Sequence, residues 1–403
     1  MKMKAILACG TAAAILAASG ANAANVHLID EGGVTGSVAE KDFKIAALFW
    51  SRMFTNDATI NLGVKFNALP PDVIGSTGST HIVGTVQEWE DGVNATKSNS
   101  TIDQTAVLPT LTPSSFDGGG AISSIMNGTD ASGTTSTAVA DQFYSAGTEG
   151  AQEYLDLNTA LVKAIGYNIG NVTDGHVQFS SDFAFDFDPT DGIDSDKMDF
   201  LGVAIHEIGH ALGFVSGVDL YDVYGGPNGP GAGLYNINDY AVLSALDMFR
   251  YSNDPNGVGP GGPQLDMTVG TASYFSIDGG HTQMFGNSLF STGTYNGDGW
   301  QASHWKDTTG PSRCDGFAQL GVMDPNVCFG QMGVVKGLDL AAFDAMGWNL
   351  STTATADYAH STSAIYAELS GSVPEPASWA LMLGGFGLIG AAMRRRRTAV
   401  SFG

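Results

Sequence analysis

The sequence predicts an α+β fold, and three observations lead to this expectation. Segments with the 3.6-residue period of helices and segments with the two-residue alternation of strands both occur along the 403-residue chain. They do not follow one another in the regular strand–helix–strand order of a doubly wound sheet. The chain also contains 21 Phe, 12 Tyr and 6 Trp, which is ample apolar surface for a core and excludes a disordered protein.

The first half of the chain predicts these elements in order. Residues 42–54 have the apolar spacing of a helix, and residues 59–66 alternate as a half-buried strand does. Residues 91–150 are rich in Ser, Thr, Gly and Ala, which favours loops with one or two short helices. Residues 153–166 are expected to form a helix that ends at Gly166.

The second half begins with residues 175–188, whose alternating Val and Phe predict an extended strand or hairpin that ends in an acidic turn. Residues 198–215 follow as a helix, and residues 338–346 form a later one closed by Gly347. Gly- and Pro-rich stretches at 224–233 and 253–263 predict surface loops. We expect one domain over 25–350, with an N-terminal lobe (25–197), the helix (198–215) and a C-terminal lobe (216–350), and then a Ser/Thr/Ala spacer over 351–372.

The charge of the chain is strongly acidic. Forty-one acids and 17 bases give a formal net charge of −24, and leaving out the six bases near the two ends gives about −30. A broad surface of that sign repels phosphate, so no nucleic-acid partner is expected.

Both ends of the chain have the composition of targeting signals. Lys2 and Lys4 precede the apolar run 5–18, and small residues at 21–23 suit cleavage, so residues 1–24 are expected to be a signal peptide. At the other end, Val373-Pro374-Glu375-Pro376 precedes an apolar span (377–393) and four arginines (394–397). This segment, 373–398, resembles the PEP-CTERM sorting signal of Gram-negative bacteria. The resemblance implies export, transient insertion into the inner membrane and cleavage by an exosortase, which leaves the protein at the cell surface or outside the cell; a permanent single-span anchor is the alternative.

Cysteine usage agrees with export. Cys9 lies in the predicted signal peptide, so the mature chain keeps Cys314 and Cys328. In an oxidising compartment two cysteines at this spacing favour one disulfide, which would contribute about 3 kcal/mol in the chain-entropy model. Two unlinked buried thiols are the alternative interpretation.

The predicted helix at 198–215 carries the motif His206-Glu207-Ile208-Gly209-His210. A four-residue separation places both imidazoles on one face of a helix, where they can bind one zinc ion. Glu207 is offset from them and can accept a proton from a zinc-bound water, whose pKa the metal lowers toward neutrality. The pattern therefore predicts a catalytic zinc site.

Such a site needs a third protein ligand. The motif is similar to the HExxHxxGxxH pattern of metzincin peptidases, which can also end in Asp, but Ser216 stands at the third ligand position and is a poor zinc ligand. His304 and Asp219 are the main candidates instead, and His281 is a further one. If Asp219 is not a ligand, its carboxylate could support a ligating histidine through a hydrogen bond.

The segment 199–348 resembles the leishmanolysin branch of the metzincins, in which HExxHALGF is followed, after a long insertion, by a histidine and a tight turn bearing methionine. The matching residues are His206, Glu207, His210, Gly213 and Phe214, then His304 and Met323. The resemblance implies a zincin-like domain with a mixed sheet, a zinc ion held by the three histidines, and Met323 beneath the metal. The expected function is that of a secreted zinc metallopeptidase, a hydrolase that cleaves a protein or peptide substrate with Glu207 as general base.

Two other interpretations of the sequence are a non-catalytic surface or matrix protein with a structural zinc site, and a zinc hydrolase of a non-peptide substrate. The aspartates between 182 and 199 also suggest a calcium site, because clustered carboxylates suit hard cations, although an ordinary solvated acidic turn explains them as well. His27, His81, His176 and His360 are expected to have no metal role.

Overall fold

The computed structural model describes residues 24–69, 74–115, 118–129, 136–307 and 319–373. Its main sheet has four strands in the order β1 (Asn25–Gly32), β2 (Thr59–Asn67), β10 (Gly175–Ser180) and β3 (Gly75–Ser79). β2 is parallel to both of its neighbours, whereas β3 is antiparallel to β10 and forms an edge of the sheet. The sheet is therefore mixed, and the fold of the described residues is α+β.

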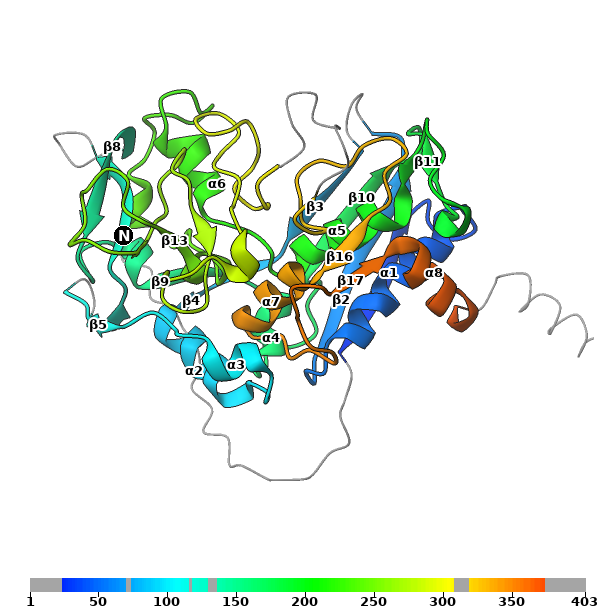
Figure 1. Cartoon of the computed structure of the whole chain (residues 1–403), viewed down its shortest axis with the longest axis horizontal. Coiled ribbons are helices and arrows are strands. Elements are labelled where there is room, and N and C mark those ends of the chain that lie inside the picture. The colour runs from blue at the N-terminus through cyan, green and yellow to red at the C-terminus, as the bar shows by residue number, and fades with distance from the viewer. Residues whose placement is uncertain (1–23, 70–73, 116–117, 130–135, 308–318, 374–403) are drawn as a thin grey trace, which may run out of the picture.

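Two helices pack on this sheet and on each other, α1 (Glu40–Met53) and α5 (Phe200–Ala211). Their shared core is aromatic: the ring of Phe43 meets those of Phe179 and Phe200 edge-on, with centroids 5.2 Å apart in both pairs. Such edge-to-face pairs add a favourable electrostatic term to the burial of apolar area. In Figure 1 the sheet with α1 lies on the right-hand side, and α5 lies near the centre of the molecule.

The remaining strands form small sheets. β4 (His81–Thr85) pairs with β9 (Tyr154–Asn158), β7 (Ser124–Thr129) with β8 (Ser136–Tyr144), and β16 (Val334–Lys336) with β17 (Ala359–Ser361), all antiparallel. The shorter strands are β5 (Thr112–Pro113), β6 (Gly120–Ala121), β11 (Phe185–Asp186), β12 (Met198–Asp199), β13 (Arg250–Ser252), β14 (Gln264–Leu265) and β15 (Tyr274–Phe275). The remaining α-helices are α2 (Val86–Thr96), α3 (Thr101–Thr105), α4 (Thr159–Ala164), α6 (Val218–Leu220), α7 (Gly337–Met346) and α8 (Thr362–Leu369).

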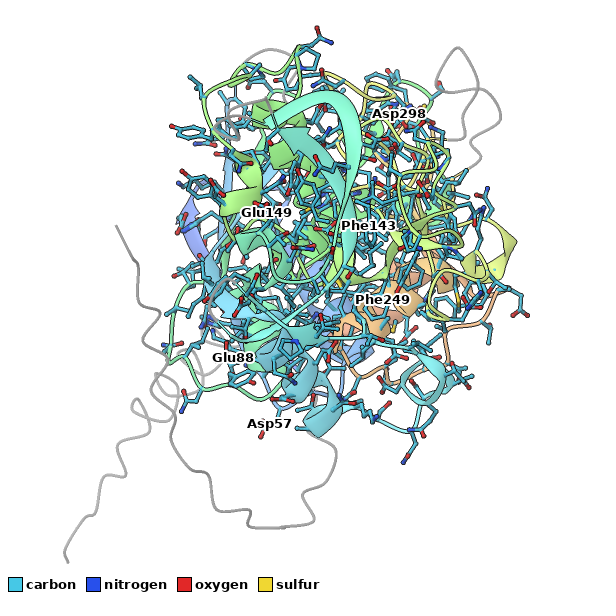
Figure 2. All side chains as sticks on the ribbon, turned by 90° about the vertical axis from the view of Figure 1, so that its left-hand side faces the viewer. Asp57, Glu88, Phe143, Glu149, Phe249 and Asp298 are labelled. Atoms are coloured by element: carbon cyan, nitrogen blue, oxygen red, sulfur yellow. The ribbon has the colours of Figure 1, made fainter. Side chains whose placement is uncertain are left out.

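Segments far apart in the sequence are joined by buried aromatic side chains. Phe249, labelled in Figure 2, is fully buried and meets the ring of Trp89 from α2 edge-on at 5.9 Å. The indole N–H of Trp89 donates to the carbonyl of Met346 at the end of α7. The part of the chain after α5 thus shares its core with the part before it, so the two predicted lobes are not independently packed.

Several elements are confirmed. The predicted helices at 42–54 and 338–346 correspond to α1 and α7, the predicted strand at 59–66 corresponds to β2, and the predicted helix at 198–215 corresponds to α5 with shorter bounds. Residues 175–188 contain β10 and β11, but β10 pairs within the main sheet and does not form a hairpin with β11.

Four expectations require correction. The first part of the predicted helix at 153–166 is the strand β9, because Leu155 and Leu157 alternate inward while paired to β4; only α4 is helical. Residues 91–150 contain the β7–β8 hairpin as well as helices. β1, α1 and β2 form a parallel strand–helix–strand unit, whereas the sequence predicted no regular order of this kind.

The fourth correction concerns the predicted spacer at 351–372. It folds into β17 and α8, and α8 packs on α1. Ile365 and Leu369 supply the buried face of α8, although Ser, Thr and Ala dominate the composition of this segment. The folded body therefore extends to Val373.

Candidate metal centre

The helix α5 is held at both ends by side chains from other elements. At its start the carboxylate of Asp199 accepts hydrogen bonds from the backbone N–H groups of Gly202 and Gly333, both at 2.9 Å. Near its end the indole N–H of Trp348 donates to the carbonyl of Leu212 at 2.9 Å, and Asn158 donates to that of His210 at 3.2 Å. These partners satisfy backbone groups that a helix end leaves unpaired, and they fix the helix in place.

The structure explains why glycine occupies two positions of the motif. Gly213 has φ = +120°, a conformation that favours glycine, and the chain turns there away from α5. The turn brings the carbonyl of Phe214 to within 2.6 Å of Nδ1 of His210. Gly209 faces Met323, whose Sδ would lie 2.7 Å from a Cβ at position 209.

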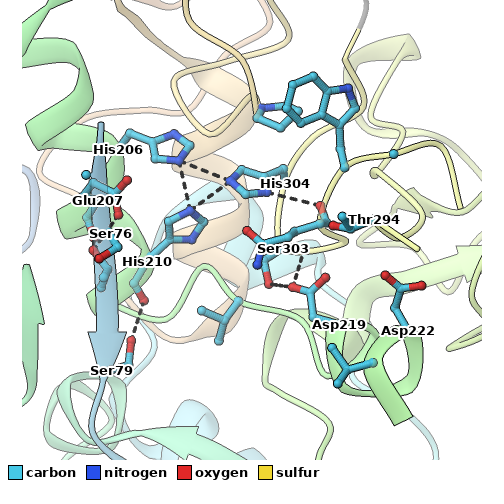
Figure 3. Close-up of a pocket in the computed structure, with 18 of the residues that line it drawn as sticks. Ser76, Ser79, His206, Glu207, His210, Asp219, Asp222, Thr294, Ser303 and His304 are labelled. Carbon is cyan, nitrogen blue, oxygen red and sulfur yellow. Dashed lines mark hydrogen bonds between the residues drawn. The ribbon is translucent and has the colours of Figure 1, made fainter. Parts of the chain in front are cut away.

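Three histidines converge on one point, as Figure 3 shows. The Nε2 atom of His210 lies 3.0 Å from that of His206 and 3.1 Å from that of His304, and the third pair is 3.3 Å apart. Tetrahedral zinc with bonds of about 2.0–2.1 Å places its nitrogen ligands about 3.3 Å from one another. The three nitrogens are therefore close enough to hold one metal ion, and their spacing is compatible with zinc.

The other ring nitrogen of each histidine contacts a backbone carbonyl. Nδ1 of His206 lies 2.7 Å from the carbonyl of Val322, and Nδ1 of His304 lies 3.2 Å from that of Gln301. An N–H at Nδ1 leaves the lone pair on Nε2, which is the form that binds a metal. Burial, together with the neighbouring His206, lowers the pKa of His210 to about 3, and burial also holds the pKa of His304 well below its usual value. Both effects favour neutral rings.

Glu207 lies beside this cluster on the wall of a cavity of about 670 Å³ that the three histidines also line (Figure 3). The hydroxyl of Thr77 on the edge strand β3 lies 2.7 Å from Oε2 of Glu207. Burial raises the pKa of Glu207, whereas the electrostatic interaction with His206 and the hydrogen bond with the Thr77 hydroxyl oppose that rise. A partly exposed carboxylate beside a metal position can act as a proton acceptor.

Asp219 does not join the cluster of ligand atoms. Its carboxylate accepts hydrogen bonds from the backbone N–H of Ala302 at 2.6 Å and of Ser303 at 3.2 Å, and from the Ser303 hydroxyl. Burial raises the pKa of Asp219 to about 6, and these bonds oppose the rise. Asp219 therefore holds the loop that carries His304. The sequence suggested a direct hydrogen bond to a ligating histidine, whereas the contact is made through Ala302 and Ser303.

The other candidate residues lie as follows. Ser216 is buried, and its hydroxyl donates to Asp247 at 2.5 Å. Met323 is fully buried beneath α5. His281 is exposed and outside the cluster. His81, His176 and His360 each lie near a carboxylate instead, at 2.9, 2.9 and 3.7 Å.

The disulfide and the calcium site stay predictions. Cys328 is buried, but Cys314 lies outside the described residues. In the acidic turn the carboxylate of Asp186 accepts from the backbone N–H groups of Asp188 and Asp194, at 3.1 and 3.0 Å. Within the described ranges, the three histidines are the only group of three or more His, Cys, Asp or Glu side chains that lie close enough to share a metal ion.

Thr77 was not among the candidates from sequence. Its segment, Gly75-Ser76-Thr77-Gly78-Ser79, has no apolar alternation to indicate a strand, and no motif contains it. Only the pairing of β3 with β10 brings it to the motif helix.

Comparison with protein families matches residues 372–397 to the PEP-CTERM protein-sorting motif. No curated protein and no solved structure matches the chain. The match confirms the sorting signal. The protein is therefore exported, to the cell surface or outside the cell of a Gram-negative bacterium. The motif is also consistent with recognition by an exosortase-type enzyme.

The membrane-related predictions fall at the two ends of the chain. Residues 1–23 and the apolar segment 377–393 lie outside the described residues. Among the residues that the structure describes, no helix is both long and apolar enough to cross a membrane.

Proposed function

We propose that this exported protein is a zinc-dependent endopeptidase with His206, His210 and His304 as the metal ligands and Glu207 as the general base. The main support for the proposal is the convergence of the three histidine Nε2 atoms, which lie within 3.3 Å of one another. The three histidines and Glu207 line the same cavity. Three protein ligands with an open side are the ligand set of catalytic rather than structural zinc sites.

In this proposal each residue of the site has a separate chemical role. Zinc held by the three histidines would polarise a substrate carbonyl and lower the pKa of a water molecule. The Glu207 carboxylate would accept a proton from the water molecule that attacks the carbonyl carbon, and would then donate this proton to the leaving amine. The Thr77 hydroxyl, 2.7 Å from Oε2, holds the carboxylate in a fixed orientation.

A peptide is the substrate class that the cleft favours. Gly75, Ser76, Thr77 and Ser79 of the edge strand β3 line the cavity, and β3 pairs on one side with β10. An extended peptide can add to such an edge through main-chain hydrogen bonds, and its scissile bond would then lie over the metal position.

We further propose that the domain is zincin-like and of the leishmanolysin type. The support is the order of the elements: a helix bearing two ligands, a third histidine 94 residues after the second, and then the buried Met323 packed beneath the helix.

The test uses purified mature protein and its Glu207→Ala variant. Wild type should contain about one equivalent of zinc and cleave casein or a peptide library, with activity lost on chelation and restored by zinc. Glu207→Ala should keep its zinc and lose at least about 100-fold in rate. Glu368→Ala, on the exposed face of α8, is the matched control and should retain full activity.

An undiminished rate in Glu207→Ala would contradict the mechanism. Zinc-loaded wild type that cleaves no peptide in the library would instead favour the alternative, a non-catalytic surface protein with a structural zinc site. Hydrolysis of only a non-peptide ester or amide by the same protein would point to a different substrate class.

A further inference from the structure

We propose that Asp339, on α7, is a positioning residue that sets the orientation of two of the three metal ligands at once, His206 and His304. The inference rests on the proposed metal site, but it concerns metal affinity and geometry, and it can be tested without any substrate.

The carboxylate of Asp339 is fully buried and accepts four hydrogen bonds. Oδ2 accepts from the backbone N–H groups of Lys336 at 2.8 Å and Val322 at 2.9 Å. Oδ1 accepts from the indole N–H of Trp305 at 2.9 Å and from the backbone N–H of Met323 at 3.2 Å. All four partners are N–H donors, so both oxygens of this carboxyl group act as acceptors.

Two of these donors belong to residues that contact or adjoin the metal ligands. Val322, held through its N–H, offers its carbonyl to Nδ1 of His206 at 2.7 Å. Trp305, held through its indole, directly follows His304 in the chain, and its backbone N–H donates to the carbonyl of Met323 at 3.0 Å. One carboxylate therefore joins the turn that orients His206 to the segment that carries His304.

The backbone around Asp339 is shaped for this contact. A Cβ at Gly321 would lie 2.2 Å from Oδ1 of Asp339, so only glycine lets the turn before Val322 approach the carboxylate so closely. The Trp305 ring is fixed as well, because it stacks on Phe290 with centroids 5.0 Å apart. These contacts leave little freedom for the turn or for Trp305.

Replacing Asp339 by Asn keeps the shape but places an N–H₂ group against two N–H donors. The turn and the Trp305 segment would then separate slightly. The rings of His206 and His304 would no longer be oriented by one common group. Groups that orient metal ligands typically change metal affinity by about 10–100-fold when they are altered.

The experiment compares wild type, Asp339→Asn and Asp344→Asn. Asp344 is the matched control: it is a fully buried carboxylate on the same helix, but it accepts from Ser100 instead of the metal-side turn. Zinc affinity is measured by competition with a chelator, and the visible absorption of the Co²⁺-substituted proteins reports ligand geometry. Asp339→Asn should bind zinc about 10–100-fold more weakly and shift the Co²⁺ bands, whereas Asp344→Asn should change neither.

Equal zinc affinity and an unchanged Co²⁺ spectrum in Asp339→Asn would overturn the proposal while leaving the metal site intact. An equal loss of affinity in Asp344→Asn would also overturn it, because the effect would then be one of general stability. Wild type that binds no zinc would refute the metal site itself.

If Asp339→Asn does not fold, Trp305→Phe provides the same test, because it removes one of the four donors and keeps an aromatic ring. Its zinc affinity should fall and its Co²⁺ spectrum should change, and wild-type values for both would overturn the proposal.

Discussion

The contact between Gly209 and Met323 allows a test of how tightly the base of the site is packed. A Cβ at position 209 would lie 2.7 Å from Sδ of Met323 and 3.2 Å from its Cε. Favourable contacts between such atoms lie near 3.5–4.0 Å, so Gly209→Ala brings Sδ about 1 Å too close. Met323 is fully buried, so its side chain has to repack among its neighbours to relieve this contact.

Two effects of this substitution oppose each other. Alanine is better than glycine inside a helix by about 1 kcal/mol. Overpacking a well-packed core costs about 1–3 kcal/mol. We expect the second effect to exceed the first, so Gly209→Ala should lower the free energy of unfolding by about 1 kcal/mol.

A double-mutant cycle with Met323→Ala separates the two effects. In the Met323→Ala background the close contact is gone, so Gly209→Ala should raise the free energy of unfolding by up to about 1 kcal/mol. Urea unfolding is followed by circular dichroism and tryptophan fluorescence in excess chelator, so that metal binding does not add to stability. The same destabilisation by Gly209→Ala in both backgrounds, or stabilisation of wild type, would refute this account.

Three further predictions address separate features. Burial and the nearby Asp199 raise the pKa of Asp42 to about 8. The folded state therefore holds this proton more tightly than the unfolded state does, and stability is lost as the pH rises from about 4 to about 8. The melting temperature of Asp42→Asn should exceed that of wild type by more at pH 8.5 than at pH 4.5, and an equal difference would contradict the assignment. Thr77→Val should lower kcat/KM for peptide cleavage about 10-fold with unchanged zinc content, and full activity would show that the hydroxyl does not orient the carboxylate. Cys314→Ser with Cys328→Ser should weaken zinc retention and lower the melting temperature, and mass spectrometry that finds two free thiols in the non-reduced mature protein would exclude the bridge.

The part of the site that follows one local pattern could be predicted from the sequence. His206 and His210 share a helical face by spacing alone, and the helix forms as expected within 198–215. His304 was a candidate because it follows at a distance and precedes a methionine turn, and the structure brings it to the other two.

The supporting groups could not be predicted because they depend on tertiary contacts between distant segments. Thr77 reaches Glu207 across 130 positions, and Trp305 reaches Asp339 across 34. Neither pair has a periodicity or a spacing that indicates the contact. The strand at Tyr154–Asn158 was mistaken for helix for a related reason: its pairing with β4 overrides a composition that suits either structure.

The correction to the predicted spacer changes how the exported protein relates to its sorting signal. Because α8 packs on α1, the described fold reaches Val373, one residue after the sorting motif begins. Only residues 374–376 lie between the body and the apolar segment 377–393, and four Cα–Cα steps span at most about 14 Å. If that segment inserts into the inner membrane, as the motif implies, Val373 lies within about 14 Å of the start of the span.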